Sequence, residues 1–135
     1  MKKTVFDGKQ WIFELISQSP VNAMVSGSIY KDKRPAGSVK EDIVINSISM
    51  DNSFLQDGVF NVNFYVPMLS VSIGGTTQYM PNNNRMAEIS KAASQVLDNV
   101  FKQEYNLTIV NHNTFEVEAE NAIYINFRIN LKAYN

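Results

Sequence analysis

Cysteine is absent from this 135-residue sequence, and histidine and tryptophan occur once each. The lack of cysteine excludes disulfide frameworks, zinc–thiolate sites and thiol nucleophiles, and it fits a protein that assembles in a reducing cytosol. With a single histidine, catalysis by an imidazole base would depend on His112 alone. No segment approaches the roughly 20 apolar residues of a membrane-spanning helix, so no membrane partner is expected.

An excess of charge is also lacking, because 12 Lys and Arg residues are balanced by 13 Asp and Glu residues. A nearly neutral chain has no overall field to attract nucleic acid or acidic lipid, so no sequence-specific nucleic-acid partner is expected. Near the N-terminus, Asp7, Lys9 and Glu14 interrupt any apolar core of a signal peptide. The length predicts a single domain, residues 1–135, which can bury a core without metal or disulfides.

What the sequence does contain is one long amphipathic segment, residues 82–103. Its apolar side chains recur at intervals of three and four, which places them on one stripe of a helix. They are Met86, Ile89, Ala93, Val96 and Val100 and, one step round, Leu97 and Phe101. Asn84 is the predicted N-cap, and Glu88 lies where a carboxylate favours the helix dipole. This segment is therefore predicted to be the longest helix.

A shorter helix is predicted near the N-terminus, beginning at Asp7 and ending near Gln18. Pro20 disfavours helical geometry at the residue before it, which explains the expected end. A second short helical turn over residues 21–25 and a short strand over residues 28–31 are predicted to follow. They lead into a charged loop that contains a proline and a glycine.

Most of the remaining sequence has the patterns of strands. Residues 42–50 are rich in β-branched side chains, and residues 59–66 alternate apolar with polar side chains. The last strand, residues 122–134, alternates throughout. At about 3.3 Å per residue it would be roughly 40 Å long and is expected to project past its own sheet. Residues 107–110 and 114–119 are predicted as two separate strands joined by a turn.

Hairpin-like connections between these strands predict a mainly antiparallel sheet. The long helix and the shorter N-terminal helix each have an apolar stripe that must be covered. The predicted fold class is therefore α+β, with both helices packed on the apolar face of the sheet. Residues 68–80 fit neither the helical nor the strand pattern, because the apolar residues at the beginning are followed by Gly74 and Gly75, which interrupt the periodicity. No phosphate-binding motif continues from these glycines, so they indicate a hinge or turn.

Three carboxylates, Glu116, Glu118 and Glu120, alternate in a segment predicted as strand. They form either a calcium-type oxygen site or an acid/base pair, or they are a charged edge that discourages aggregation. Successive carboxylates on one strand face stand about 7 Å apart, wider than a single ion bridges. His112, in the predicted turn, is either a catalytic base or a solvated side chain. The geometry favours the structural interpretations, so no catalytic, cofactor-binding or metal-binding residue is assigned.

Three surfaces are predicted to contact other chains. They are Lys31, Asp32, Lys33 and Arg34 of the charged loop; Met68, Leu69, Val71 and Ile73 of an apolar arm; and Arg128, Lys132 and Tyr134 of the last strand. The first two have alternatives: the loop is a solvated mixed-charge segment, and the arm is an ordinary edge strand. A face carrying Asn61, Asn63, Asn126 and Asn130 either meets another protein without burying charge or is a wet sheet face.

Several stretches of sequence carry a resemblance to a known family. They are SGSIY, KDKRPAGSVKEDIVINSI, GVFNVNFYVP and YINFRINLKAY, and the most specific parts are IYKDKRPAGS, EDIVIN and NVNFYVP. Together with the two predicted helices, they resemble the tail-terminator, or tail-completion, proteins of long-tailed phages, which are also found in prophages of Bacteroides-like bacteria. The resemblance covers most of the chain in the order of its elements.

This resemblance implies an α+β structural subunit with no enzymatic residues to transfer and no cofactor. It also implies a ring, typically a hexamer, that caps the tail tube and offers a surface to the head connector. The implied locations are the cytoplasm of a bacterial host during assembly and then the virion tail. Two alternatives remain open. One is a small metal- or ligand-binding enzyme domain that uses His112 and the Glu116, Glu118 and Glu120 strand; the other is a monomeric binding module of a conjugative or secretion system.

Overall fold

The computed structural model describes residues 1–134 of the chain. In order, its elements are α1 (Val5–Ser17), α2 (Pro20–Met24), β1 (Ile29–Lys31), β2 (Ile43–Met50), β3 (Gln56–Pro67), β4 (Leu69–Ile73), β5 (Thr76–Met80), α3 (Asn83–Leu97), β6 (Val100–Phe101), β7 (Tyr105–Val117), the 3-10 turn η1 (Glu118–Glu120) and β8 (Ala122–Ala133). Among these described residues, no helix is long and apolar enough to cross a membrane.

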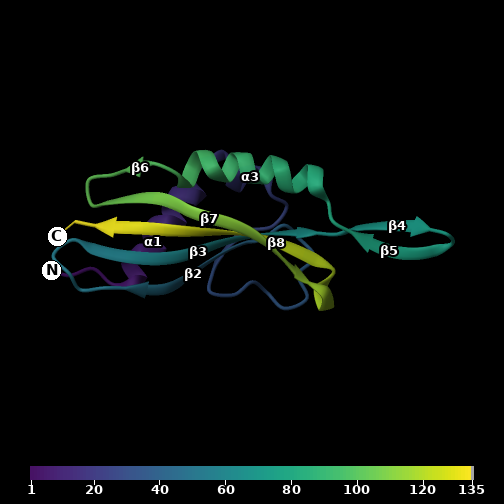
Figure 1. The fold of residues 1–135 in the computed structure, drawn as a ribbon, viewed down its shortest axis with the longest axis horizontal. Helices are drawn as coiled ribbons and strands as arrows, with labels where there is room; N and C mark the ends of the chain where they lie inside the picture. Colours follow the sequence, from purple (N-terminus) through teal and green to yellow (C-terminus); the bar gives the residue numbers. More distant parts are fainter. Residues whose placement is uncertain (135) are drawn as a thin grey trace.

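Strands dominate the architecture. They hold 45% of the residues and the helices only 27%, so the predicted α+β class with one long helix as its organising element is wrong. The main element is a curled six-stranded sheet in the order β1-β2-β3-β8-β7-β6, in which only β1 and β2 are parallel. Strands β4 and β5 form a separate hairpin beyond one end of this sheet (Figure 1).

The centre of the sheet is the pair β3 and β8. These strands are matched along their full length, from Gln56 opposite Ala133 to Pro67 opposite Ala122. On its other side β8 is matched with β7 over the same span, from Ala133 to Ala122. The last strand therefore has a neighbour on both sides throughout, and the prediction that it projects past its sheet is wrong. Its length is used entirely within the sheet.

Helices α1 and α3 pack on one face of the sheet, and α2 packs against both of these helices. Helix α1 lies against β1, β2 and β3, and α3 lies against β3, β7 and β8. The buried core between helices and sheet includes Ile12, Ile16, Ile45, Phe60, Val62, Phe64, Ile89, Leu97, Ile125, Phe127 and Ile129. The period-two apolar pattern of β3 and β8 predicted which side chains face this core.

Helix α3 is shorter than the sequence pattern predicted, because it ends at Leu97. Asn99 then adopts a left-handed backbone with φ of 52°, and the next two residues form β6, with Val100 opposite Leu107 of β7. The side chain of Asp98 accepts a hydrogen bond from the Ile109 N–H at 2.9 Å, which fastens this turn. The N-cap is Asn82, whose side-chain oxygen accepts from the first turn, and the prediction of Asn84 is wrong.

Strand β7 was expected to be two strands with a turn around His112. It is one strand, interrupted by a bulge between Ile109 and Asn111, and His112 lies opposite Phe127 of β8. The Asn-His-Asn sequence has turn chemistry, but pairing with the long alternating strand β8 keeps the backbone extended. The extra residue is absorbed by the bulge, which restores the register.

Helix α1 packs unusually closely on the sheet at Gly8. The helix begins with a capping box between Thr4 and Asp7, one residue before this glycine. A β-carbon at Gly8 would overlap the Phe60 ring, with two further ring carbons at 2.9 Å, and Phe60 is fully buried. The helix backbone can therefore lie this near to the sheet only because residue 8 has no side chain.

Substituting Gly8→Ala should consequently destabilise the protein, although alanine is favoured over glycine within helices by about 1 kcal/mol. Overpacking a core usually costs about 1–3 kcal/mol, and we expect a net loss within that range in urea unfolding. Lys91→Ala on the exposed side of α3 is the control and should change stability little. Combining Gly8→Ala with Phe60→Leu should recover part of the loss. A neutral or stabilising Gly8→Ala would contradict the close contact.

Candidate functional site

Two parts of the described surface are not covered by the helices. One is the hairpin of β4 and β5, residues 69–80, which we call the hairpin arm. The other is the sheet face opposite the helices, which we call the open face. The arm leaves the six-stranded sheet at the end of β3 and extends along the long axis of the molecule (Figure 1).

The hairpin arm is exposed on both of its faces. Apart from half-buried Val71, every residue from 69 to 80 is exposed. The turn uses Gly74 and Gly75, both left-handed with φ of 59° and 81°, as two-residue hairpin turns require. Leu69 and Val71 lie on the same face as Met80, because Leu69 is opposite Met80 across the hairpin. The arm also contains no Asp, Glu, Lys or Arg.

On the open face, asparagine side chains bond one another across three strands. Asn126 of β8 donates to Asn61 at 3.1 Å and to Asn63 at 2.7 Å, both on β3. Asn61 in turn donates to Asn46 of β2 at 3.1 Å. Asn63 and Asn126 are each only 8% exposed. Three of the four asparagines predicted on this face therefore belong, with Asn46, to an ordered amide network, and the fourth, Asn130, is half-buried.

Aromatic rings continue this face toward η1. Phe115 of β7 stacks on Tyr124 of β8 with ring centroids 5.3 Å apart, and Tyr124 contacts Tyr65 of β3 at 5.0 Å. The guanidinium of Arg34 lies 3.9 Å from the centre of the Tyr65 ring. Burial raises the pKa of the Tyr65 hydroxyl, against the opposing effect of nearby Arg34. The charged loop is thus seated on the aromatic end of the open face.

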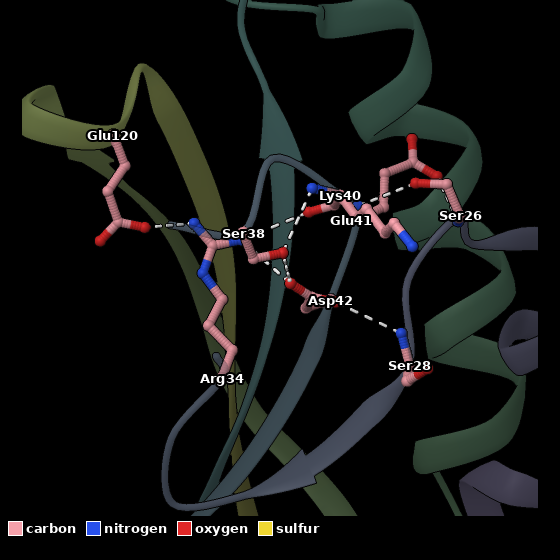
Figure 2. Close-up of polar contacts among 8 residues, drawn as sticks. All are labelled: Ser26, Ser28, Arg34, Ser38, Lys40, Glu41, Asp42 and Glu120. Atoms are coloured by element: carbon pink, nitrogen blue, oxygen red, sulfur yellow. Dashed lines mark hydrogen bonds and ion pairs between the residues drawn. The ribbon is translucent and has the colours of Figure 1, made fainter. Parts of the chain in front are cut away.

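Polar contacts fix this loop to the rest of the chain (Figure 2). Arg34, with a side chain 8% exposed, forms ion pairs with Asp42, at 3.4 Å, and with Glu120 of η1. Asp42 is 1% exposed and also accepts hydrogen bonds from the Ser38 hydroxyl and from the Ser28 N–H at 3.3 Å. Arg34 and Asp42 therefore hold the charged loop against β1 and η1, and both side chains are paired with groups of their own chain.

The other three residues of the charged loop that were predicted to contact other chains have different environments. Asp32, whose φ is 71°, pairs with the buried Lys9 at 3.0 Å. Lys31 donates to Gln10 of α1, whereas Lys33 is exposed. The structure thus distributes Lys31, Asp32 and Arg34 among contacts inside the chain, although Lys31 and Asp32 are exposed like Lys33. Their role between chains stays a prediction.

The predicted contact residues of the last strand are also separated by environment. Arg128 is exposed, Lys132 pairs with Asp57 at 2.8 Å, and the Tyr134 hydroxyl accepts from the Asn106 amide at 2.6 Å. Met68, at the base of the arm, is half-buried, and its N–H donates to the Asn121 carbonyl at 2.9 Å. Arg128 and Lys132 share one face of β8, whereas Met68 lies beyond the end of β3, and the interface role of these residues likewise remains a prediction.

The carboxylates proposed as an acid or metal site do not share a strand. Glu116 lies on β7, whereas Glu118 and Glu120 lie in η1, and Glu120 is occupied by Arg34. The left-handed Asn121, with φ of 49°, closes this tight connection to β8. His112 lies in mid-strand with its ring 5.6 Å from that of Phe127. In residues 1–134, no group of three or more acidic, histidine or cysteine side chains is arranged to hold a metal.

Comparisons with known proteins give a distant likeness among solved structures. No family model matches the chain, and no curated protein matches it. Among solved structures, a chain of the structure titled "Virion of native gene transfer agent (GTA) particle" is similar, with a TM-score of 0.47 and 12% sequence identity. The match covers 98% of this chain and 92% of that chain.

Replacing Arg34 with methionine should be strongly destabilising, because it leaves the buried Asp42 carboxylate without its cation. Breaking a buried ion pair on one side costs about 3–5 kcal/mol. The exposed Lys33 provides a matched control on the same loop, and Lys33→Met should leave the free energy of unfolding nearly unchanged. The free energy of unfolding of both variants is measured by chemical denaturation at concentrations where the protein is monomeric. Equal effects of the two substitutions would show that the network in Figure 2 does not stabilise the fold.

A second ion pair fastens the end of the same loop to α3. Arg85 donates to both carboxylate oxygens of Glu41, at 2.7 and 2.9 Å, and also to the Met24 carbonyl of α2. The Arg85 hydrogen bonds hold the pKa of Glu41 below its usual 4.5, with burial acting in the opposite direction and the Ser26 N–H reinforcing the shift. This contact joins the loop, α2 and the beginning of α3.

Because the pKa of Glu41 is lower in the folded state, its stabilisation is complete above the unfolded pKa of 4.5 and is lost as pH falls through the folded pKa. Glu41→Gln should lower stability at pH 7 by about 1.5–3 kcal/mol, the usual range for hydrogen bonds to charged groups. The difference between wild type and variant should shrink below pH 4.5. Thermal unfolding measured from pH 7 to pH 3 tests this, and a constant difference across that range would contradict the role of the carboxylate.

Proposed function

We propose that this chain is a structural subunit of a phage or prophage tail, in which copies assemble as the terminator, or completion, ring at the head–tail junction. The single observation that carries the proposal is the hairpin arm. Its strands are uncharged and exposed, and its apolar side chains include Leu69, Val71, Ile73 and Met80. An isolated two-stranded hairpin is at best marginally stable in water, so such an arm is suited to being covered by a partner.

The open face supports the same proposal in a second way. Its asparagines are uncharged and hold one another in place, so a partner that covers them meets few charges. The exposed Arg128, opposite Asn61 on the same face, is the charge that such a partner would have to pair or leave in water. We assign this face to contact with the tail-tube or head-connector proteins. The sequence resemblance to tail terminators supplies the identity of these partners. The gene transfer agent likeness is too distant to count as support.

The proposal includes no catalytic role. Glu120 is paired with Arg34, and His112 lies against Phe127, so neither is set beside a second reactive group. This arrangement favours a structural subunit over the alternative of a small enzyme domain. A hexameric ring, bacterial cytoplasm as the place of assembly, and the virion tail as the final location belong to the proposal through the resemblance.

Light scattering coupled to size-exclusion chromatography, over a range of concentrations, tests the proposal. We expect assembly above the monomer mass, either by the protein alone or on addition of tail-tube protein. Ile73→Lys, on the arm, should weaken the association constant at least tenfold. The matched control is Ile48→Lys, because Ile48 of β2 is 50% exposed and Ile73 is 49% exposed. A strict monomer at every concentration, unaltered by tail-tube protein, would overturn the proposal and favour a monomeric binding module.

A further inference from the structure

The edge strand β7 is largely unpaired on its outer side. Strand β6 is opposite only Asn106 and Leu107, so β7 continues without an outer neighbouring strand in the part of the chain that the structure describes. The Ile109 N–H, which follows these residues on the outer side of β7, donates its hydrogen bond to the side chain of Asp98. We call the remaining stretch, residues 110–117, the free edge.

The free edge lacks the usual protection of an edge strand. Natural sheets discourage strand addition by placing lysine, proline or a bulge along such an edge. Here residues 110–115 contain no charged residue and no proline, and Glu116 is the first charge. The bulge lies between Ile109 and Asn111, at the beginning of the free edge, and leaves the rest regular. Val110 and Phe115 are exposed apolar side chains on it.

The opposite side of the sheet offers a poorer site for strand addition. Strand β1 is only three residues long and covers Ile43 to Ile45 of β2. The rest of β2 is short and is broken by a bulge between Ser47 and Ser49. The free edge of β7 is therefore the longest regular backbone edge that the six-stranded sheet presents in residues 1–134.

The hairpin arm also has backbone edges without a neighbouring strand. Strands β4 and β5 pair only with each other, so each has one outer edge whose backbone groups lack a neighbouring strand within the described chain. The arm points beyond the end of the six-stranded sheet, away from its own β7 (Figure 1). The arm is therefore placed to pair with the free edge of another copy rather than with the free edge of its own chain.

We propose that the hairpin arm of one copy adds as extra strands to the free edge of β7 in the next copy. This inference rests on the assembly proposed above and names the receiving surface. Strand addition would satisfy backbone donors and acceptors on both edges. Because neither edge carries a charge before Glu116, no ion is removed from water along most of the contact. The two surfaces differ, so the contact is heterologous and generates a ring when the rotation per copy closes.

Cross-linking tests the contact directly, because the natural sequence has no cysteine to interfere. Arm variants Ser72→Cys in β4 and Thr77→Cys in β5 are each combined with Asn111→Cys or Asn113→Cys on the free edge. A disulfide requires α-carbons within about 7 Å, so it reports on adjacent strands. Mild oxidation of the full chain should give a ladder of covalent oligomers for at least one pair. Mixing separate arm and edge single-cysteine variants should stop at dimers.

A second test on the free edge, with two matched controls on the β2 edge, separates this contact from others. The same arm cysteines combined with Ser49→Cys, on the β2 edge, should give no ladder. Thr114→Lys, which places a charge on the free edge, should weaken association at least tenfold while the thermal midpoint of the monomer is retained. Ser49→Lys should leave association unchanged.

The outcomes also separate this inference from the proposed function. An oligomer in which no arm–edge pair cross-links and Thr114→Lys assembles normally would overturn strand addition but leave a ring subunit intact. Dimers formed by Asn113→Cys alone would indicate edge-to-edge pairing of two β7 strands, which also overturns it. A strict monomer, with or without tail-tube protein, would overturn both proposals.

Discussion

Pairing of β8 with neighbours on both sides is the constraint on which the rest of the structure depends. Every second residue from Ile123 to Ala133 is buried beneath the helices, so a slip of one residue would turn this entire apolar face outward. Strand β3 has the same alternation and locks the register from the other side. Strands with less regular sequences adapt to this pair, since β7 and β2 each contain a bulge where their own spacing does not match.

Because the helices cover one face, the remaining interactions are organised around the other. The amide network and the aromatic row make the open face ordered, and the loop between β1 and β2 is fastened at both of its ends. Arg34 joins the beginning of the loop to Asp42 at its end and to Tyr65 and η1, while Glu41 joins the loop to α3 through Arg85. Charges that look like a surface cluster in the sequence thus serve mainly to connect distant segments, which leaves the uncharged arm and the free edge as the candidate sites of assembly.

The sequence was sufficient where a segment's structure is decided by its own periodicity, as in residues 59–66, residues 122–134 and the N-terminal part of α3. It was insufficient where distant pairing decides. Val100 fits the apolar stripe of the helix by its spacing, yet it lies in β6 because it pairs with Leu107 of β7. The asparagines around His112 are typical of a turn, yet they lie in a strand because this segment pairs with β8. The glycine pair indicates a hinge or turn by itself, and only the pairing of the residues on its two sides makes it the turn of a hairpin. The environment of Arg34 could not be predicted, because its partners come from three separate parts of the chain.

The route by which the arm joins the sheet has a mechanical consequence. Only Met68 separates the end of β3 from the beginning of β4, and β3 is held along its whole length by β8. The arm's second strand continues into α3 after only two residues, so a pull along its axis is shared between α3 and β3. The part that passes through Met68 loads the hydrogen bonds of β3 in shear, all together, instead of opening them one after another. A subunit held by its arm would resist tension with the fully paired centre of its own sheet.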